Sequence, residues 1–514
     1  MKRVFLSKAI VSFFFFLILC FSLLILKTPV LSQTGTTYYV STTGNDSNAG
    51  TQSQPWKTIQ KAANTALAGN TIIVLAGNYS TERVQVTRSG TAGSSITYQA
   101  NGTVTMRGFT VIASYITIDG FDITNTANAD QDGWGVYVKG SHCLIENNYI
   151  YYATRGGILL YADQGSYNNT VDNTVRNNVL YRNSQVGVQV QGNNSLIEGN
   201  EVSHSLQYHP SWVNPPDWVD ADGMRFFGSG HIFRGNYIHD ITMDDPENHD
   251  PHIDGFQTFD NSGWTVGTNC IFEQNLVNIL DNGSEAFMTE GSSGLIIRNN
   301  IFHCFRGVIA SRSTSYQIVN NTYVTQLNFD PNVGPVGVSL EESATNMVIK
   351  NNIWYNSPVG GIYVHDNGSL SGLDAGHNLT YRSDGGSTSG THYPGDLWQI
   401  NPQYVNPASD FHLQAGSPAI NAGVAIGSVT NDYDGNARPQ GTGYDIGAYE
   451  YGGTVQPTSV PTSTPTPKSS LTPTSKPTPT STPTPTPTID PCPNRKIGNL
   501  DCDAAGKVNQ TDFV

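Results

Sequence analysis

Two long insertions of this chain end in acidic residues, and these side chains are well suited to chemistry. Asp220 and Asp222 end the first insertion, and Asp254 ends the second. Two carboxylates about 5 Å apart cannot both stay ionised cheaply unless a cation lies between or beside them. We therefore predict that Asp220, Asp222 and Asp254 hold a metal ion, with Ca²⁺ as the expected cofactor, or that Arg225 neutralises them. A structural acidic ladder is the alternative for Asp222 and Asp254, and no zinc-type spacing is present.

Neighbouring residues could supply catalysis and ligand binding. Arginines can neutralise an anionic group, paired carboxyl groups can serve as acid and base, and aromatic rings can form platforms for apolar ring faces. The candidate catalytic residues are Arg225, Arg306, Glu285, Glu290 and His252. The candidate substrate-binding residues are Trp218, Gln257, Phe259 and Arg312.

A repeated phrase indicates the architecture that must position these residues. It consists of an apolar residue, two variable residues, Asn and then usually one or two apolar residues, as in Ile-Glu-Asn-Asn-Tyr-Ile at 145–150. The shortest spacings are 21, 22 and 25 residues. They are too short for a β-α-β unit of ~30 residues but long enough for short strands joined by tight turns. The matching asparagines are Asn148, Asn178, Asn200, Asn236, Asn275, Asn300, Asn321 and Asn352.

Such coils predict an all-β fold in which like residues stack in columns about 4.8 Å apart. Asn tolerates left-handed backbone and can form side-chain ladders, so one Asn per coil is expected at a corner. With these repeats the chain resembles the right-handed parallel β-helix family over residues 37–451. The segment 56–67 carries an apolar helical stripe that includes Leu67, and we expect this helix to cap the N-terminal end of the solenoid.

The two longest spacings, 36 and 39 residues, place the acidic insertions on adjacent coils. Aligning the coils by the glycine after each acidic residue stacks Asp222 and Asp254 in one column, with Ser284 and Arg306 as its next members. The same alignment places Phe287 on the outer face, two residues past the glycine position. Long loops on a rigid scaffold are the usual place for function.

Two coils resemble the calcium-binding part of family 9 pectate lyases, in which an Ala-Asp-Gly coil and an Asp-Asp-Gly coil supply acidic ligands. The matching residues here are Ala221-Asp222-Gly223 and Ile253-Asp254-Gly255. The family's basic lysine, one coil later, has no counterpart, because Phe287 takes its place in the alignment. Arginine is the base in some other β-helix lyases, which leaves Arg225, Arg306 or Arg312. The resemblance therefore implies a Ca²⁺-assisted lyase whose base is still open.

Charge and the chain ends narrow the functional classes. The formal net charge is −15 and the pI is about 5.1, which argues against nucleic acid as a partner. Residues 1–32 have the pattern of a secretory signal peptide, so we expect a secreted protein; an uncleaved anchor is the alternative. Cys143, Cys270 and Cys304 are isolated and are expected in the core, whereas Cys492 and Cys502 could pair.

The C-terminal part has a different composition. Residues 452–493 are rich in Thr and Pro, which predicts an extended linker. Residues 494–514 resemble the first half of a dockerin module, with Asp501, Asp503 and Asp512 as ligands of an EF-hand-like calcium loop. Ala505 replaces an expected ligand and no second repeat follows, which favours a truncated or remnant module. The resemblance implies a cohesin or a cell-surface component as partner, and we expect a monomer.

Three functions fit these features. The first is a polysaccharide lyase that cleaves an acidic, uronate-containing glycan by Ca²⁺-assisted β-elimination. The second is a glycoside hydrolase that uses two carboxyl groups from Asp222, Asp254, Glu285 and Glu290. The third is a non-catalytic glycan-binding or adhesive surface protein.

Overall fold

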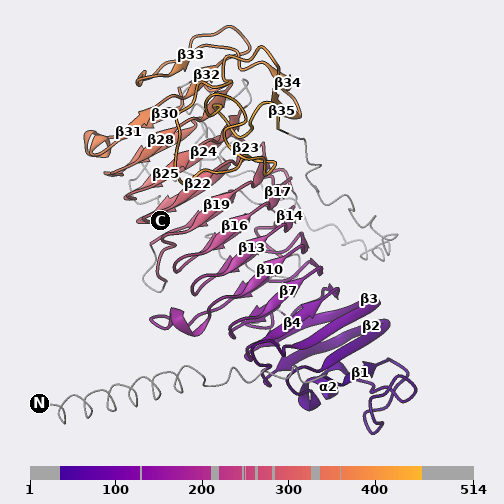
Figure 1. Cartoon of the computed structure of the whole chain (residues 1–514). Coiled ribbons are helices and arrows are strands. Elements are labelled where there is room, and N and C mark those ends of the chain that lie inside the picture. Colours follow the sequence, from indigo (N-terminus) through magenta and orange to yellow (C-terminus); the bar gives the residue numbers. More distant parts are fainter. Residues whose placement is uncertain are drawn as a thin grey trace, which may run out of the picture.

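The chain folds as a parallel β-helix, seen in Figure 1 as a stack of coils from the N-terminal to the C-terminal end. The computed structural model describes residues 35–127, 130–209, 219–245, 248, 251–260, 264–280, 284–325, 336–358 and 360–453. Each regular coil contributes three short strands, and equivalent strands of successive coils pair in parallel and in register. The predicted fold class is confirmed.

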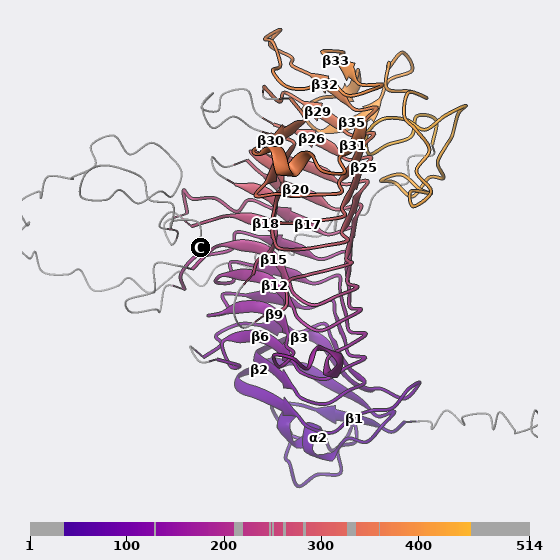
Figure 2. The same ribbon diagram turned by 90° about the vertical axis from the view of Figure 1, so that its left-hand side faces the viewer.

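Three parallel sheets form the faces of the coil (Figures 1 and 2). Sheet 1 contains β6 (Trp134–Val138), β9 (Gly156–Leu160), β12 (Val186–Val190), β15 (Asp222–Phe226), β18 (Asp254–Thr258), β21 (Glu285–Glu290), β24 (Arg306–Ser311), β27 (Val338–Glu341) and β30 (Ile362–Val364). Sheet 2 contains β4 (Ile116–Asp119), β7 (Leu144–Glu146), β10 (Thr174–Arg176), β13 (Leu196–Glu198), β16 (Ile232–Arg234), β19 (Ile271–Glu273), β22 (Ile296–Arg298), β25 (Gln317–Val319), β28 (Val348–Lys350) and β31 (Asp374–Gly376). Sheet 3 contains β5 (Asp122–Ile123), β8 (Tyr149–Tyr151), β11 (Val179–Tyr181), β14 (Glu201–Ser203), β17 (Tyr237–His239), β20 (Leu276–Ile279), β23 (Ile301–Cys304), β26 (Thr322–Val324), β29 (Ile353–Tyr355), β32 (Leu379–Tyr381) and β33 (Leu397–Trp398).

The repeated asparagines form a buried ladder along the stack, as predicted. In each coil the Asn side-chain Oδ1 accepts hydrogen bonds from the backbone N–H and from Nδ2 of the Asn one coil earlier; for Asn236 these come from Asn200 at 3.0 and 3.1 Å. The ladder continues beyond Asn352 to Asn378 and ends on the carboxylate of Asp396. The left-handed backbone lies one residue before each ladder Asn, for example at Asn299 with φ 52°. Each ladder Asn thus lies at the corner between a strand of sheet 2 and a strand of sheet 3, as expected, while the residue before it adopts the left-handed backbone.

Alternating charges on the outer side of sheet 2 help to keep successive coils in register. The residue two positions before each ladder Asn alternates between acid and arginine over six coils, and neighbours in this series are direct cross-strand partners. Opposite charges placed side by side stabilise this pairing, and a slipped coil would lose it. The series is Glu146, Arg176, Glu198, Arg234, Glu273 and Arg298.

The N-terminal end is closed by α2 (Ile59–Thr65), which packs against β2 (Thr71–Val86) and β1 (Thr37–Val40), while β3 (Ile96–Val111) starts the regular stack. The helix is shorter than the expected 56–67. Asp46 accepts the backbone N–H of Lys57 at 2.8 Å and that of Thr58 at 2.9 Å, which holds the entry extended until Thr58 caps the helix. Leu67 is 54% exposed, so its predicted place on the buried stripe is wrong. Within the described residues no helix has the length and apolarity needed to span a bilayer.

After β33 the chain folds back over sheet 3 of the last coils. A short antiparallel pair, β34 (Tyr404–Asn406) and β35 (Asp410–Leu413), starts this segment. Residues from it cover the outward side chains of the sheet, including Ile353 and Leu379. Two 3₁₀ turns, η1 (Tyr167–Asn169) and η2 (Asn367–Leu370), lie in loops. Cys143, Cys270 and Cys304 are buried and unpaired, as expected.

Candidate functional site

Four charged side chains stand in one column at the start of successive strands of sheet 1. Asp254 is the cross-strand partner of Glu285, and Glu285 is the partner of Arg306. Asp222 precedes Asp254 in the same column, and its Oδ1 accepts the backbone N–H of Asp254 at 3.1 Å. The predicted stacking of the two aspartates is therefore present in the structure. We call Asp222, Asp254, Glu285 and Arg306 the charged column.

The glycines after the two aspartates show why the column faces outward. A Cβ at Gly223 would lie 2.6 Å from Ile238 Cγ2, and one at Gly255 would lie 2.8 Å from Val277 Cγ1. Ile238 and Val277 belong to the core, so the glycine position points inward and leaves no room for a side chain. The preceding aspartate therefore points to the outer face of the sheet. Both aspartates are nevertheless almost completely buried.

The third member of the column differs from the prediction. Glu285, and not Ser284, pairs with Asp254, while the Ser284 hydroxyl donates to the carbonyl of Ile279 at 2.9 Å. Phe287 consequently lies in the core, and Met288 takes the outward position next to Gln257. The alignment was one residue off because this coil has Ala286 at the place of the glycine. The outward position of this coil is therefore Met288 instead of the predicted Phe287, and neither residue is a lysine.

Arg225 is the internal counter-ion of the column. Its Nε donates to Asp222 Oδ2 at 2.5 Å, and its Nη2 lies 3.4 Å from Asp220 Oδ2. Burial lowers the pKa of Arg225, but the carboxylates of Asp222 and Asp220 raise it by more, so the guanidinium stays charged. The predicted neutralisation of the aspartates by Arg225 is therefore seen in the structure. An arginine held this way is unsuited to act as the base.

Asp254 lacks such a partner. Its Oδ2 is buried without a hydrogen bond, and so is Oε1 of Gln257. Burial first, and then the charges of Glu285, Asp222 and Asp220, raise the pKa of Asp254 well above its usual range. Burial also raises the pKa of Asp222 to about 7, although Arg225 opposes it. The column thus holds more carboxyl groups than its arginines neutralise. Asp254 is therefore either protonated or balanced by a bound cation.

The column opens to solvent toward Arg306. Arg306 Nη1 donates to Glu285 Oε1 at 2.9 Å, and their side chains are 30% and 14% exposed. Burial raises the pKa of Glu285, with Arg306 and His252 opposing this shift. His252 is exposed near Glu285, and its backbone carbonyl accepts the N–H of Ala221. A substrate would therefore reach Glu285, Arg306 and His252 before the buried aspartates.

The other candidates lie farther along the strands or outside the described residues. Glu290 pairs with Arg312 at 2.6 Å near the C-terminal end of β21, away from the charged column along the strand. Phe259 is half-buried just after β18. Trp218 lies outside the described residues, as do the signal peptide, most of the linker 452–493 and the segment 494–514 with Asp501, Asp503 and Asp512. Their predicted roles stay predictions.

The donor set fits a hard cation in part. Unpaired buried oxygens such as Asp254 Oδ2 and Gln257 Oε1 are the kind of ligand that Ca²⁺ prefers. Within the part of the chain that the structure describes, no three His, Cys, Asp or Glu side chains converge as a metal-binding group. The Asp222 carboxylate is engaged by Arg225 and by the N–H of Asp254. Ca²⁺ therefore stays a prediction, with Asp254 and Gln257 as the donors that fit it.

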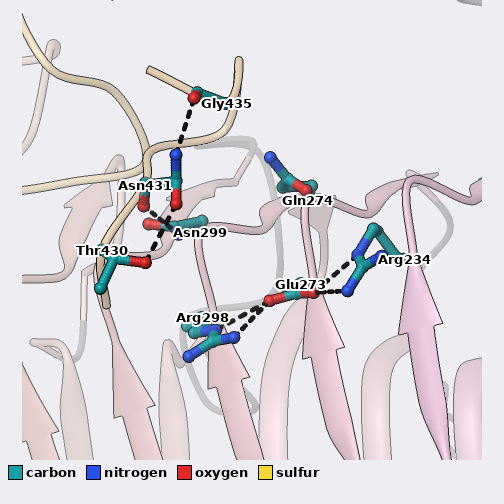
Figure 3. A pocket seen from close by; sticks show the side chains of 8 residues that line it. All are labelled: Arg234, Glu273, Gln274, Arg298, Asn299, Thr430, Asn431 and Gly435. Carbon is teal, nitrogen blue, oxygen red and sulfur yellow. Dashed lines mark hydrogen bonds and ion pairs between the residues drawn. The ribbon is translucent and has the colours of Figure 1, made fainter. Parts of the chain in front are cut away.

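A cavity of about 390 Å³ lies elsewhere, between the outer side of sheet 2 and the C-terminal segment (Figure 3). Its lining consists of Arg234, Glu273, Gln274, Arg298, Asn299, Thr430, Asn431 and Gly435. Glu273 lies between the two arginines and pairs with Arg234 at 2.7 Å and with Arg298 at 2.6 Å. Asn299 Nδ2 donates to the carbonyl of Asn431 at 2.6 Å. These groups are satisfied within the protein, and they dock the C-terminal segment onto the coils.

Comparison with known families agrees with this architecture. A family model described as "Pel9A-like, right handed beta helix region" matches residues 38–195. A second model, described as "Right handed beta helix region", matches residues 249–388. Both matched regions are described as right-handed β-helix, which confirms the predicted handedness.

Individual relatives cover parts of the chain. The uncharacterized protein YwoF of Bacillus subtilis is 33% identical over 147 residues, 25% of this chain and 30% of that protein. The pectate lyase PEL9 of Emericella nidulans is 31% identical over 209 residues, 38% of this chain and 45% of that protein. The chain thus spans less than half the length of either relative.

Two solved structures are similar to this chain at low sequence identity. The pectate lyase Pel9A is 18% identical, with a TM-score of 0.45 over 82% of this chain and 98% of that one. XylC in complex with xylose is 12% identical, with a TM-score of 0.50 over 81% of this chain and 98% of that one.

Proposed function

We propose that this carbohydrate-active β-helix protein is a secreted polysaccharide lyase that cleaves a uronate-containing glycan by β-elimination. The observation that carries the proposal is the charged column: three acids and an arginine on the outer face of sheet 1, buried at one end and open at Glu285 and Arg306. The similarity of part of the chain to the pectate lyase PEL9 supports the same reaction class.

The accessible residues suit the elimination. Arg306 pairs with the uronate carboxylate, which lowers the cost of removing the adjacent C5 proton. The imidazole of His252 takes that proton, because histidine is the most common general base and this side chain is exposed near Glu285. The C5–H electron pair forms the C4–C5 double bond, the bond from C4 to the glycosidic oxygen breaks, and that oxygen receives a proton from solvent. Glu285 orients Arg306 through their ion pair.

A cation adds to this chemistry where Asp254 and Gln257 offer their unpaired oxygens. Bound Ca²⁺ would supply positive charge beside the uronate carboxylate. The protein itself keeps these oxygen donors buried next to the accessible end of the column. Arg225 holds the Asp222 side chain in place, and Asp222 Oδ1 accepts the backbone N–H of Asp254 on the neighbouring strand.

The decisive experiment is incubation with polygalacturonate, alginate and a glycosaminoglycan, followed by ultraviolet absorbance and reducing-end assays. A lyase produces unsaturated, absorbing ends with every cut. His252→Ala and Arg306→Ala should each lower this rate by at least about 100-fold, the usual contribution of a general base or a charge-stabilising group. Activity that persists in both variants would exclude the open end of the column as the centre.

A glycoside hydrolase is the second candidate, and one observation favours it. Asp254 has a strongly raised pKa and stands on the strand next to Glu285, about 4.8 Å away along the stack. A protonated acid beside an ionised carboxylate is the arrangement used by retaining hydrolases. New reducing ends without ultraviolet absorbance would select this reaction. Binding without cleavage of any glycan would leave a non-catalytic surface protein.

A further inference from the structure

Two half-buried aromatic rings lie at the end of the sheet 1 strands opposite the charged column. Phe259 directly follows β18 and is five residues past Asp254, so it lies about 16 Å from the charged column along the strand direction. Trp264 lies next to it, with the two ring centroids 5.9 Å apart. The repeat phrase of the sequence gives no signal for Trp264, because this residue belongs to an insertion between two coils.

The pair is rigidly supported from behind. Phe227, which is fully buried, contacts Phe259 edge to face at 5.3 Å and Trp264 at 4.6 Å between ring centroids. The backbone after Trp264 is fixed as well: Val266 bridges to Phe227, and the N–H of Thr265 donates to the Tyr167 hydroxyl at 2.8 Å. The rings therefore form a surface that needs no ordering when a ligand arrives.

We propose that Phe259 and Trp264 form a sugar-stacking subsite for a pyranose ring several rings along the glycan from the one held at Glu285 and Arg306. This inference rests on the proposed function and adds where the glycan lies: along the strands of sheet 1, from the open end of the charged column to the aromatic pair. Aromatic faces bind the C–H face of a sugar without requiring charge, and the nearby Glu290 is already neutralised by Arg312 at 2.6 Å. The subsite therefore contributes affinity and register, and no chemistry.

The test separates affinity from catalysis. With oligogalacturonides as the probe, Trp264→Ala should raise KM about tenfold while kcat stays within about twofold, because stacking acts equally before and during the reaction. Trp264→Phe keeps a ring and should recover most of the affinity. Tyr363→Ala is the matched control, since Tyr363 is 40% exposed on the outer side of the same sheet, in β30. An unchanged KM in Trp264→Ala, or an equal loss in Tyr363→Ala, would overturn the subsite.

Binding measured without turnover distinguishes the two proposals. Titration of the same oligosaccharides, followed by intrinsic tryptophan fluorescence, should show about tenfold weaker binding in Trp264→Ala than in the wild-type protein. If the wild-type protein binds but does not cleave, and Trp264→Ala weakens binding, the subsite holds and the lyase proposal fails. If the wild-type protein cleaves and Trp264→Ala binds equally well, the lyase holds and the subsite fails. If the wild-type protein neither binds nor cleaves these oligosaccharides, both proposals are refuted.

Discussion

Replacing one rung of the asparagine ladder should measure how strongly the ladder holds the coils together. Asn236 is fully enclosed, and its side chain takes part in four hydrogen bonds. Oδ1 accepts the backbone N–H and Nδ2 of Asn200, and Nδ2 donates to the Ile197 carbonyl and to Asn275 Oδ1, all at 2.9–3.1 Å. Asn236→Ala removes all four.

The cost follows from which groups keep a partner. Asn200 Nδ2 still donates to the Val175 carbonyl, and Asn275 Oδ1 still accepts the Asn236 backbone N–H. The backbone N–H of Asn200 loses its acceptor, Asn236 Oδ1, which costs about 1–3 kcal/mol, and the other three bonds contribute about 0.5–1.5 kcal/mol each. We therefore expect a loss of about 5 kcal/mol. With an unfolding entropy of about 0.8 kcal/mol per kelvin for roughly 400 ordered residues, this lowers Tm by about 6 °C.

Thermal unfolding followed by circular dichroism is the assay, with Asn101→Ala as control. Asn101 is an exposed residue of β3, so its replacement should shift Tm by less than about 1 °C. A shift in Asn236→Ala no larger than that of the control would refute the account of the ladder as a main source of coil-to-coil stability.

Three further predictions concern the buried polar groups. His231 is enclosed, accepts the Ser195 N–H at 3.1 Å, and has a pKa lowered by burial to about 4. Because the unfolded chain binds this proton more readily, the free energy of unfolding is highest above pH ~6.5 and falls by about 3 kcal/mol as the pH drops to 4. His231→Asn should flatten this pH dependence in urea titrations at several pH values. Asp222→Ala leaves the buried Arg225 with a single long contact and should cost about 3 kcal/mol, so lost activity there coincides with a lower unfolding midpoint. Removal of Ca²⁺ by a chelator should lower lyase activity, and Asp254→Asn should weaken Ca²⁺ binding measured by calorimetry at constant Tm; equal binding in the variant would remove Asp254 as a ligand.

The architecture could be predicted because Asn repeats at the position in each coil where a side chain must bond the backbone of the neighbouring coil. Each ladder Asn bonds the next coil, so its spacing in the sequence is the length of a coil. The pairing of Asp222 with Asp254 followed from the same register, since both coils carry a glycine that marks where the chain must avoid the core. That marker is missing in the next coil, where Ala286 fits, and the prediction slipped by one residue to Ser284.

Other features depend on contacts that no local pattern records. Trp264 gains its place from packing on Phe227, a contact across an insertion of a different coil. The fold-back of the C-terminal segment over sheet 3 covers an apolar face whose residues look in sequence like ordinary strand positions, such as Ile353. The role of Arg225 was left open between arginine and metal, and only its 2.5 Å contact with Asp222 identified it as the counter-ion.

The proposed β-elimination takes place at the open end of the charged column. The direct measurement is the rate of ultraviolet-absorbing product formation from polygalacturonate by the wild-type protein, His252→Ala and the exposed-tyrosine control Tyr363→Ala. We expect absorbing products with the wild-type protein and the control, and at least about 100-fold less with His252→Ala at unchanged Tm. Equal rates in all three proteins would contradict this expectation.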